Sequence, residues 1–77
     1  MNAQQRRRQS RRCSHQVVLE CSNEQYFRFD ARVAESIHWA RLHCLPEDWY
    51  HRERDYRSHK FWFRSGPVAS AFALRWL

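Results

Sequence analysis

Hydrophobic and polar positions alternate in two short segments near the start of the chain. Residues 16–21, QVVLEC, and residues 25–30, QYFRFD, have β-branched or aromatic side chains at roughly every second position. The Ser-Asn-Glu sequence at 22–24 is typical of a turn. This pattern predicts a β-hairpin. Each strand would direct its apolar side chains to one face, namely Val17, Leu19 and Cys21 on the first strand and Phe27 and Phe29 on the second.

A helical period follows the predicted hairpin. Apolar side chains recur at i, i+4, i+7 and i+11 from Val33, which predicts a helix from Asp30 to about Cys44. Asp30 suits the N-cap position. Pro46 ends the helix, because proline disfavours the helical conformation of the residue before it. The apolar stripe consists of Val33, Ile37, Ala40 and Cys44. Trp39 falls on a different row, outside this stripe.

The second half of the chain contains one clear strand and two ambiguous segments. Residues 60–64, KFWFR, alternate cationic and aromatic side chains and predict a strand, which the following Ser-Gly-Pro ends. Residues 46–58 begin with a proline and two acids, as a short helix does, but fit a charged loop nearly as well. Residues 68–76 alternate as in a strand, yet their three alanines and the preceding proline favour a helix, which we expect.

Together these elements predict a small α+β domain over residues 15–77, preceded by a disordered arm of residues 1–14. The expected order is ββα(α)βα, which describes a three-stranded antiparallel sheet with two or three helices on one face. A chain of 77 residues has room for one such domain.

The formal net charge of +6 is concentrated in the arm. Of the 14 Lys and Arg residues, five arginines precede the first of the 8 acids, so nine cations and eight acids leave the rest of the chain at +1. A polar arm without apolar anchors cannot offset its ordering entropy, which predicts disorder. Its candidate phosphate contacts are Arg6, Arg7, Arg8, Arg11 and Arg12. A solubilising tail without a fixed target explains the same charge equally well.

Composition excludes several function classes. Gly66 is the only glycine, so neither a P-loop nor a G-x-G-x-x-G dinucleotide-binding turn can form. No apolar run reaches the roughly 18 residues of a membrane span. The three cysteines and five histidines lack metal-finger spacing, and no nucleophile with its base is identifiable, so we expect no metal, no cofactor and no enzyme activity. The odd number of cysteines, with Cys13 exposed in the arm, indicates reduced thiols rather than a secreted disulfide scaffold.

Twelve aromatic residues follow the arm, more than one small core needs. On the strand at 60–64, Phe61 and Phe63 would face the helices, and Trp62 would face outward with Lys60 and Arg64. The predicted hairpin would contribute to the same outward face. The resulting candidate partner-binding surface consists of Tyr26, Arg28, Trp62 and Arg64. Aromatic and guanidinium groups on an open sheet stack the bases of single strands, and the same residue types are enriched at protein–protein hot spots. A helix or a self-dimer could instead cover this face.

An aromatic strand and a following motif stand at the C-terminal end of the sequence. They read Phe61-Trp62-Phe63 and, after a break, Ala69-x-x-Phe72-x-Leu74-x-Trp76. This ending resembles that of many small phage-encoded proteins of unknown function, in which an acidic turn joins the two elements. Here residues 64–67, RSGP, take the place of that turn. The resemblance, confined to residues 61–77, implies a bacterial-virus setting and a small α+β module, and it assigns no catalytic or binding residues.

The sequence therefore predicts a non-enzymatic phage-type accessory protein. It would bind a host protein or protein–nucleic-acid complex and inhibit or redirect it, as in host takeover or anti-defence, with the arm adding electrostatic steering. Direct binding of DNA or RNA by the arm and the aromatic sheet face is the alternative, and a virion structural or assembly role is the third. We expect the bacterial host cytoplasm as the location and no membrane partner, and a homodimer is left open.

Overall fold

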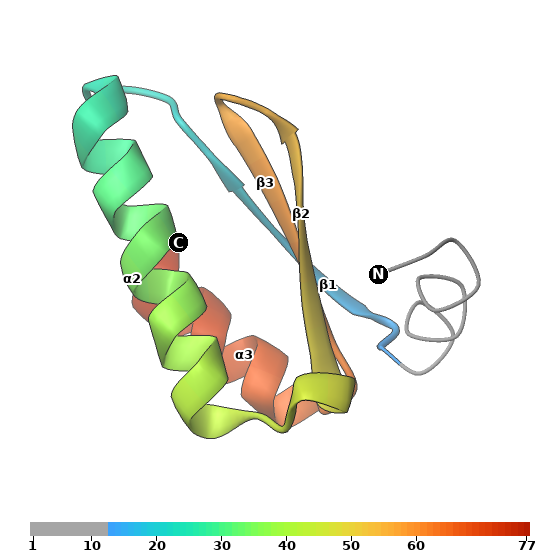
Figure 1. Cartoon of the computed structure of the whole chain (residues 1–77). Coiled ribbons are helices and arrows are strands. Elements are labelled where there is room, and N and C mark those ends of the chain that lie inside the picture. The colour runs from blue at the N-terminus through green and yellow to red at the C-terminus, as the bar shows by residue number, and fades with distance from the viewer. Residues whose placement is uncertain (1–12) are drawn as a thin grey trace.

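The computed structural model describes residues 13–77 as a sheet with two helices packed against it (Figure 1). The elements in chain order are β1 (His15–Glu20), α2 (Tyr26–His43), the 3-10 turn η1 (Pro46–Asp48), β2 (Trp49–Asp55), β3 (Ser58–Phe63) and α3 (Gly66–Trp76). The three strands form one antiparallel sheet, which confirms the predicted α+β class. The predicted disordered arm lies outside the described residues, apart from its last two positions.

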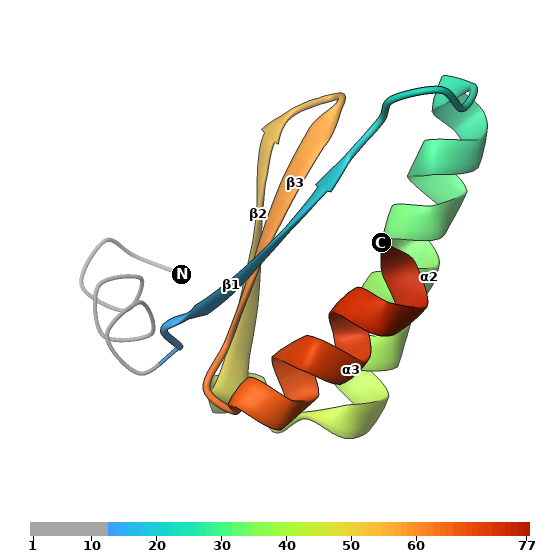
Figure 2. The ribbon, with the colours of Figure 1, turned by 180° about the vertical axis from the view of Figure 1, so that it is seen from behind.

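β3 is the central strand of the sheet, whose order is β1-β3-β2. The pairing places Val17 of β1 and His51 of β2 on either side of Phe61. Helix α2 separates β1 from the other two strands in the sequence, whereas β2 and β3 form a hairpin. Both helices cover the same face of the sheet, as expected from the sequence (Figure 2). We call the opposite face of the sheet the outer face.

The predicted strand at 25–30 is wrong, because this segment forms the first turns of α2. Phe27 and Phe29 alternate, but Phe29 also lies four residues before Val33 and so extends the apolar stripe of the helix. In the helix Phe29 is fully buried and Phe27 is 65% exposed. Asp30 is therefore an exposed residue inside the helix, and the N-cap is Gln25, whose side chain makes no capping hydrogen bond.

The short helix considered for the segment at 46–58 is limited to one 3-10 turn at its start, and most of the segment is a strand that was not considered. It forms η1 and then the strand β2, which pairs with β3 along its length except at a bulge between Glu53 and Asp55. The order of elements is consequently βα(η)ββα. The predicted second strand at 25–30 belongs to a helix, and the ambiguous segment at 46–58 supplies the third strand of the sheet instead. The backbone hydrogen bonds of β2 come from β3, and a local pattern of charged residues contains no sign of such pairing.

The core lies between the sheet and the two helices. Phe61 and Phe63 point toward the helices, as predicted, and are fully buried together with Phe29 and Phe72. The ring of Phe72, on α3, lies 4.7 Å from the ring of Phe61 and 4.9 Å from that of Phe63. The predicted α3 is confirmed, and the Ser65 hydroxyl caps it by accepting a hydrogen bond from the Val68 amide at 3.3 Å.

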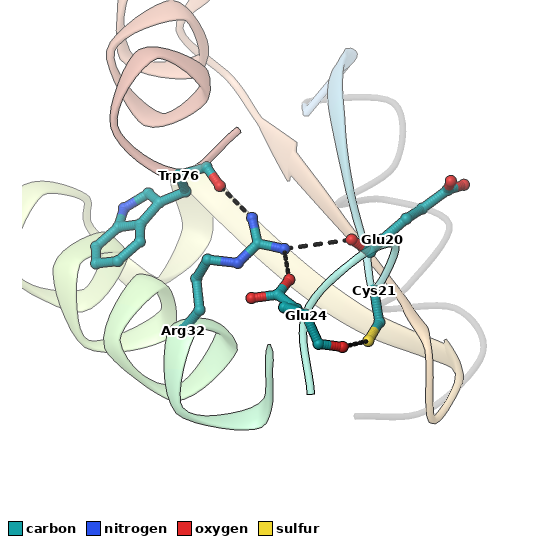
Figure 3. Close-up of polar contacts among 5 residues, drawn as sticks. All are labelled: Glu20, Cys21, Glu24, Arg32 and Trp76. Carbon is teal, nitrogen blue, oxygen red and sulfur yellow. Dashed lines mark hydrogen bonds and ion pairs between the residues drawn. The ribbon is translucent and has the colours of Figure 1, made fainter. Parts of the chain in front are cut away.

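Arg32 of α2 connects the ends of three elements (Figure 3). Its guanidinium donates hydrogen bonds to the carbonyl oxygen of Trp76 at the end of α3 and to that of Glu20 at the end of β1, at 2.5 and 3.2 Å. It also pairs with the carboxylate of Glu24 at 2.5 Å. These bonds hold the C-terminal turn of α3 against α2.

Candidate functional site

Two aromatic rings stack on the outer face of the sheet. Tyr50 of β2 lies directly opposite Trp62 of β3 in the strand register. Their ring centroids are 4.4 Å apart with an angle of 6° between the planes, and both side chains are half-buried. Side chains alternate along a strand, so Trp62 points away from the helices, because Phe61 and Phe63 point toward them. We call this pair the aromatic pair.

Cationic side chains surround the aromatic pair. Two register positions along the same hairpin, on the same face of the sheet, Arg52 lies opposite Lys60. Together with Arg54, Glu53 and Trp62 these residues line a shallow hollow of about 410 Å³ on the surface. Three of its five lining residues are cationic and one is acidic, so the net charge of the hollow is +2. The hollow beside the aromatic pair is therefore more positive than the described residues as a whole, whose net charge is +1.

Arg64 follows the last residue of β3 and lines a hollow with residues from the end of α2 and the start of α3. Its guanidinium forms an ion pair with the carboxylate of Asp48 at 3.4 Å, and its side chain is 60% exposed. An exposed pair of this length contributes little to stability, so Arg64 can exchange Asp48 for another anion at low cost.

The chain enters the domain at the same end of the sheet as the aromatic pair. Gln16, the second residue of β1, is paired with Trp62. Cys13 is fully buried, contrary to its predicted exposure in the arm, and its thiol donates a hydrogen bond to the carbonyl oxygen of Glu47 at 3.8 Å. The five arginines at positions 6–12 thus precede a point next to the aromatic pair, although they lie outside the described residues themselves.

The structure brings together only part of the predicted partner-binding surface. Trp62 lies on the outer face, and Arg64 follows it two residues later, beside Asp48 and the start of α3. Tyr26 and Arg28 do not join them, because they belong to the first turns of α2. The ring of Tyr26 instead contacts that of Tyr56 in the β2–β3 turn, with centroids 5.7 Å apart. The predicted grouping fails for the same reason as the predicted hairpin.

Three residues of the outer face were not among the predicted site residues: Tyr50, Arg52 and Lys60. Lys60 was expected to face outward but was not assigned to the surface. Tyr50 and Arg52 lie in residues 49–55, WYHRERD, in which apolar and polar residues do not alternate, so no local strand signal marked them. The proline and the two acids before this segment instead resemble the start of a helix.

Two histidines meet on the inner face of the hairpin. The Nε2 atom of His51 lies 2.7 Å from Nδ1 of His59, and the planes of the two rings differ by 7°. Burial, and next to it the proximity of His59, lowers the pKa of His51 to about 4. Their ring nitrogens therefore share a hydrogen bond that needs at least one neutral ring.

The remaining reactive groups of the described range are dispersed. Burial, and secondarily the carboxylate of Asp48, raises the pKa of the Cys44 thiol, so less thiolate is present than for a free cysteine. No three His, Cys, Asp or Glu side chains within residues 13–77 are grouped to hold a metal ion. Over the same residues, neither helix has the length and apolar character needed to cross a membrane.

Comparison with protein-family models, curated proteins and solved structures found no match. The site is therefore interpreted from its own geometry.

Proposed function

We propose that this protein is a non-enzymatic binding protein that holds single-stranded nucleic acid on the outer face of its sheet. The observation that carries the proposal is the stacked pair of Tyr50 and Trp62 beside Arg52 and Lys60. Aromatic rings on an open sheet stack with unpaired bases, and each stacked base contributes about 1–3 kcal/mol. Cations a few ångströms away neutralise the phosphates between those bases.

The arm fits the same ligand. Its five arginines precede β1 in the sequence, and Gln16 of β1 is paired with Trp62 of the aromatic pair. For single strands the slope of log K against log salt changes by about 0.7 for each neutralised phosphate, so five contacts correspond to about 3.5. Bases stacked on the aromatic pair would fix the position of the nucleic-acid strand. The arm would add affinity that depends on salt.

Fluorescence anisotropy with a labelled pyrimidine oligonucleotide tests the proposal. Trp62→Ala should weaken binding about 10- to 100-fold, the equivalent of one stacked base. Phe27→Ala is the matched control, since Phe27 is an exposed aromatic residue on α2, on the helix side. Its affinity should equal that of the unmodified protein. Binding that is equally strong with Trp62→Ala, or no binding at low salt, would contradict the proposal.

Deletion of residues 1–12 separates the two contributions. The shortened chain should retain weak binding that still depends on Trp62, and the salt slope should become smaller by up to about 3.5. An unchanged slope would show that the arm does not contact the strand. A duplex of the same sequence should bind less tightly, because its bases are not free to stack on the aromatic pair.

The second candidate is the phage-type accessory function, in which the same surface binds a host complex that handles nucleic acid. The composition of the outer face supports it, because Trp, Tyr and Arg are the residues most enriched in protein–protein hot spots. Recovery of a host protein with the intact chain, its loss with Trp62→Ala and its survival of nuclease treatment would favour this candidate. Loss after nuclease treatment would instead indicate that nucleic acid bridges the two proteins. The bacterial-virus setting, the cytoplasmic location and the virion role remain predictions of the sequence.

A further inference from the structure

A groove lies between α2 and α3, on the helix side of the molecule and away from the aromatic pair. It has a volume of about 640 Å³, and its apolar lining includes Trp39, Leu42 and Trp76. The indole of Trp39 stacks on the ring of His43 with centroids 4.2 Å apart and meets Phe72 edge-on. Both ring contacts lie beneath the groove and support its floor. We call it the helix groove.

The edge of the helix groove exposes a large apolar side chain. Leu42 is 69% exposed at the last turn of α2. Trp39 and Trp76 next to it are only half-buried. Leu42 therefore offers an apolar side chain at the rim of a groove whose floor contains two tryptophans.

The two walls of the helix groove carry opposite charges. Glu35 lies on α2 and Arg75 on α3, and both line the groove. Both are exposed, and neither forms an ion pair with another residue of the described range. The guanidinium of Arg75 lies over the ring of Trp76, 5.4 Å from its centroid. A surface with one acid and one base on opposite walls is complementary to itself after a two-fold rotation.

We propose that two copies of this chain pair through the helix groove. Leu42 of each copy packs against Trp39 and Trp76 of the other, and Glu35 of each copy faces Arg75 of the other, so that the ion pair forms twice. A chain of 77 residues has a small core, and oligomerisation is one of the usual ways in which such chains gain stability. The dimer leaves the two outer faces of the sheets free on opposite sides, so the pairing does not depend on the proposed binding of nucleic acid.

Sedimentation of the full-length protein from about 1 µM to about 1 mM tests the pairing. The unmodified protein should change from monomer to dimer within this range. Leu42→Glu should raise the dissociation constant at least about 30-fold, the loss expected for a hot-spot residue. Leu74→Glu is the matched control, since Leu74 is 90% exposed on α3 but does not line the groove. Circular dichroism should show that both variants are folded, because both side chains are already in water.

A charge exchange gives a sharper test of the two-fold contact. Glu35→Arg and Arg75→Glu should each weaken self-association, because each variant places like charges opposite each other in its own dimer. An equimolar mixture of the two variants should form a heterodimer as stable as the original, because both contacts are then restored. A protein that stays monomeric at all concentrations would overturn the proposal. So would single variants that pair normally, or a mixture that gains nothing over its components.

Discussion

The outer face of the sheet and the helix groove differ in the geometry that displays their side chains. On the outer face, two-residue alternation brings Tyr50 beside Trp62 and Arg52 beside Lys60, so rings and cations form adjacent rows on a flat surface. In the helix groove, the spacing of three and four residues collects Trp39 and Leu42 into an apolar hollow with single charges at its walls. The first arrangement suits a flexible polyanion with flat bases, and the second suits another apolar protein surface.

One layer of residues supports both surfaces. Phe61 and Phe63 of β3 are buried on the inner side of the strand that displays Lys60 and Trp62 on its outer side. Phe72 of α3 packs on both phenylalanines and on Trp39 of the helix groove. Substitutions can therefore be chosen to affect both surfaces together or each of them separately.

Phe72→Ala should have the largest effect and should remove both surfaces. Loss of a buried phenylalanine typically costs about 3–5 kcal/mol, and a domain of this size has a free energy of unfolding of about 4–12 kcal/mol. Chemical denaturation followed by circular dichroism should show a transition shifted to low denaturant or absent. Phe27→Ala, at a position 65% exposed, should change the free energy by less than about 0.5 kcal/mol. Similar losses in the two variants would show that Phe72 is not the shared support.

Arg32→Ala should weaken the helix groove more than the outer face. The guanidinium holds the last turn of α3, which carries Trp76, through three hydrogen bonds to Trp76, Glu20 and Glu24. We expect the free energy of unfolding to fall by about 2 kcal/mol. Self-association should weaken, whereas the affinity for oligonucleotide should stay within about two-fold under conditions where the variant is folded. Arg28→Ala on the exposed side of α2 is the control, and equal effects of the two variants would contradict the role of Arg32.

The elements that depend on residues close together in the sequence could be predicted, whereas those that depend on pairing between distant residues could not. The α+β class, β1, the central strand and residues 30–43 of α2 follow from local periodicity and from Pro46. The helix α3 follows instead from its alanines and Pro67, against an alternating pattern. The helical state of residues 25–30 was not predicted, because Phe27 and Phe29 fit the two-residue period of a strand. Only the four-residue distance from Phe29 to Val33 indicates the helix. β2 depends on pairing with β3, and the contact of Tyr50 with Trp62 depends on the register of that pairing. No local pattern contains that register, so the sequence did not reveal Tyr50 as the neighbour of Trp62 on the outer face.

Acidification should destabilise the hairpin that carries the aromatic pair. The pKa of His51 is lowered to about 4 in the folded protein by burial and by His59, whereas an unfolded histidine has a pKa of about 6.5. The unfolded chain therefore binds a proton more readily, and stability is full above about pH 6.5 and falls as the pH decreases toward 4. We expect a loss of about 1–2 kcal/mol, less than the full shift implies, because the ring is partly solvated.

Urea denaturation at about pH 7.5 and about pH 5 measures this loss. His51→Gln should remove that part of the pH dependence, whereas His38→Gln at an exposed position of α2 should keep it. Because His51 belongs to β2, oligonucleotide binding should decline with the loss of stability, and the helix groove should be less affected. An equal dependence on pH in the His51→Gln variant would show that other groups control it.

Ser65→Ala should have the smallest effect and should leave the difference between the two surfaces unchanged. The Ser65 hydroxyl accepts the hydrogen bond of the Val68 amide in the first turn of α3, and loss of such a cap costs about 1 kcal/mol. Ser65→Asp should restore that stability or exceed it, because a carboxylate accepts the same bond and favours the positive end of the helix dipole. Ser65 lies at the start of α3, whereas Arg75 and Trp76 line the helix groove at its end. Both binding constants should therefore equal those of the unmodified protein. If either constant changes in the folded Ser65→Ala variant, that surface depends on the overall stability of the domain rather than on its own residues.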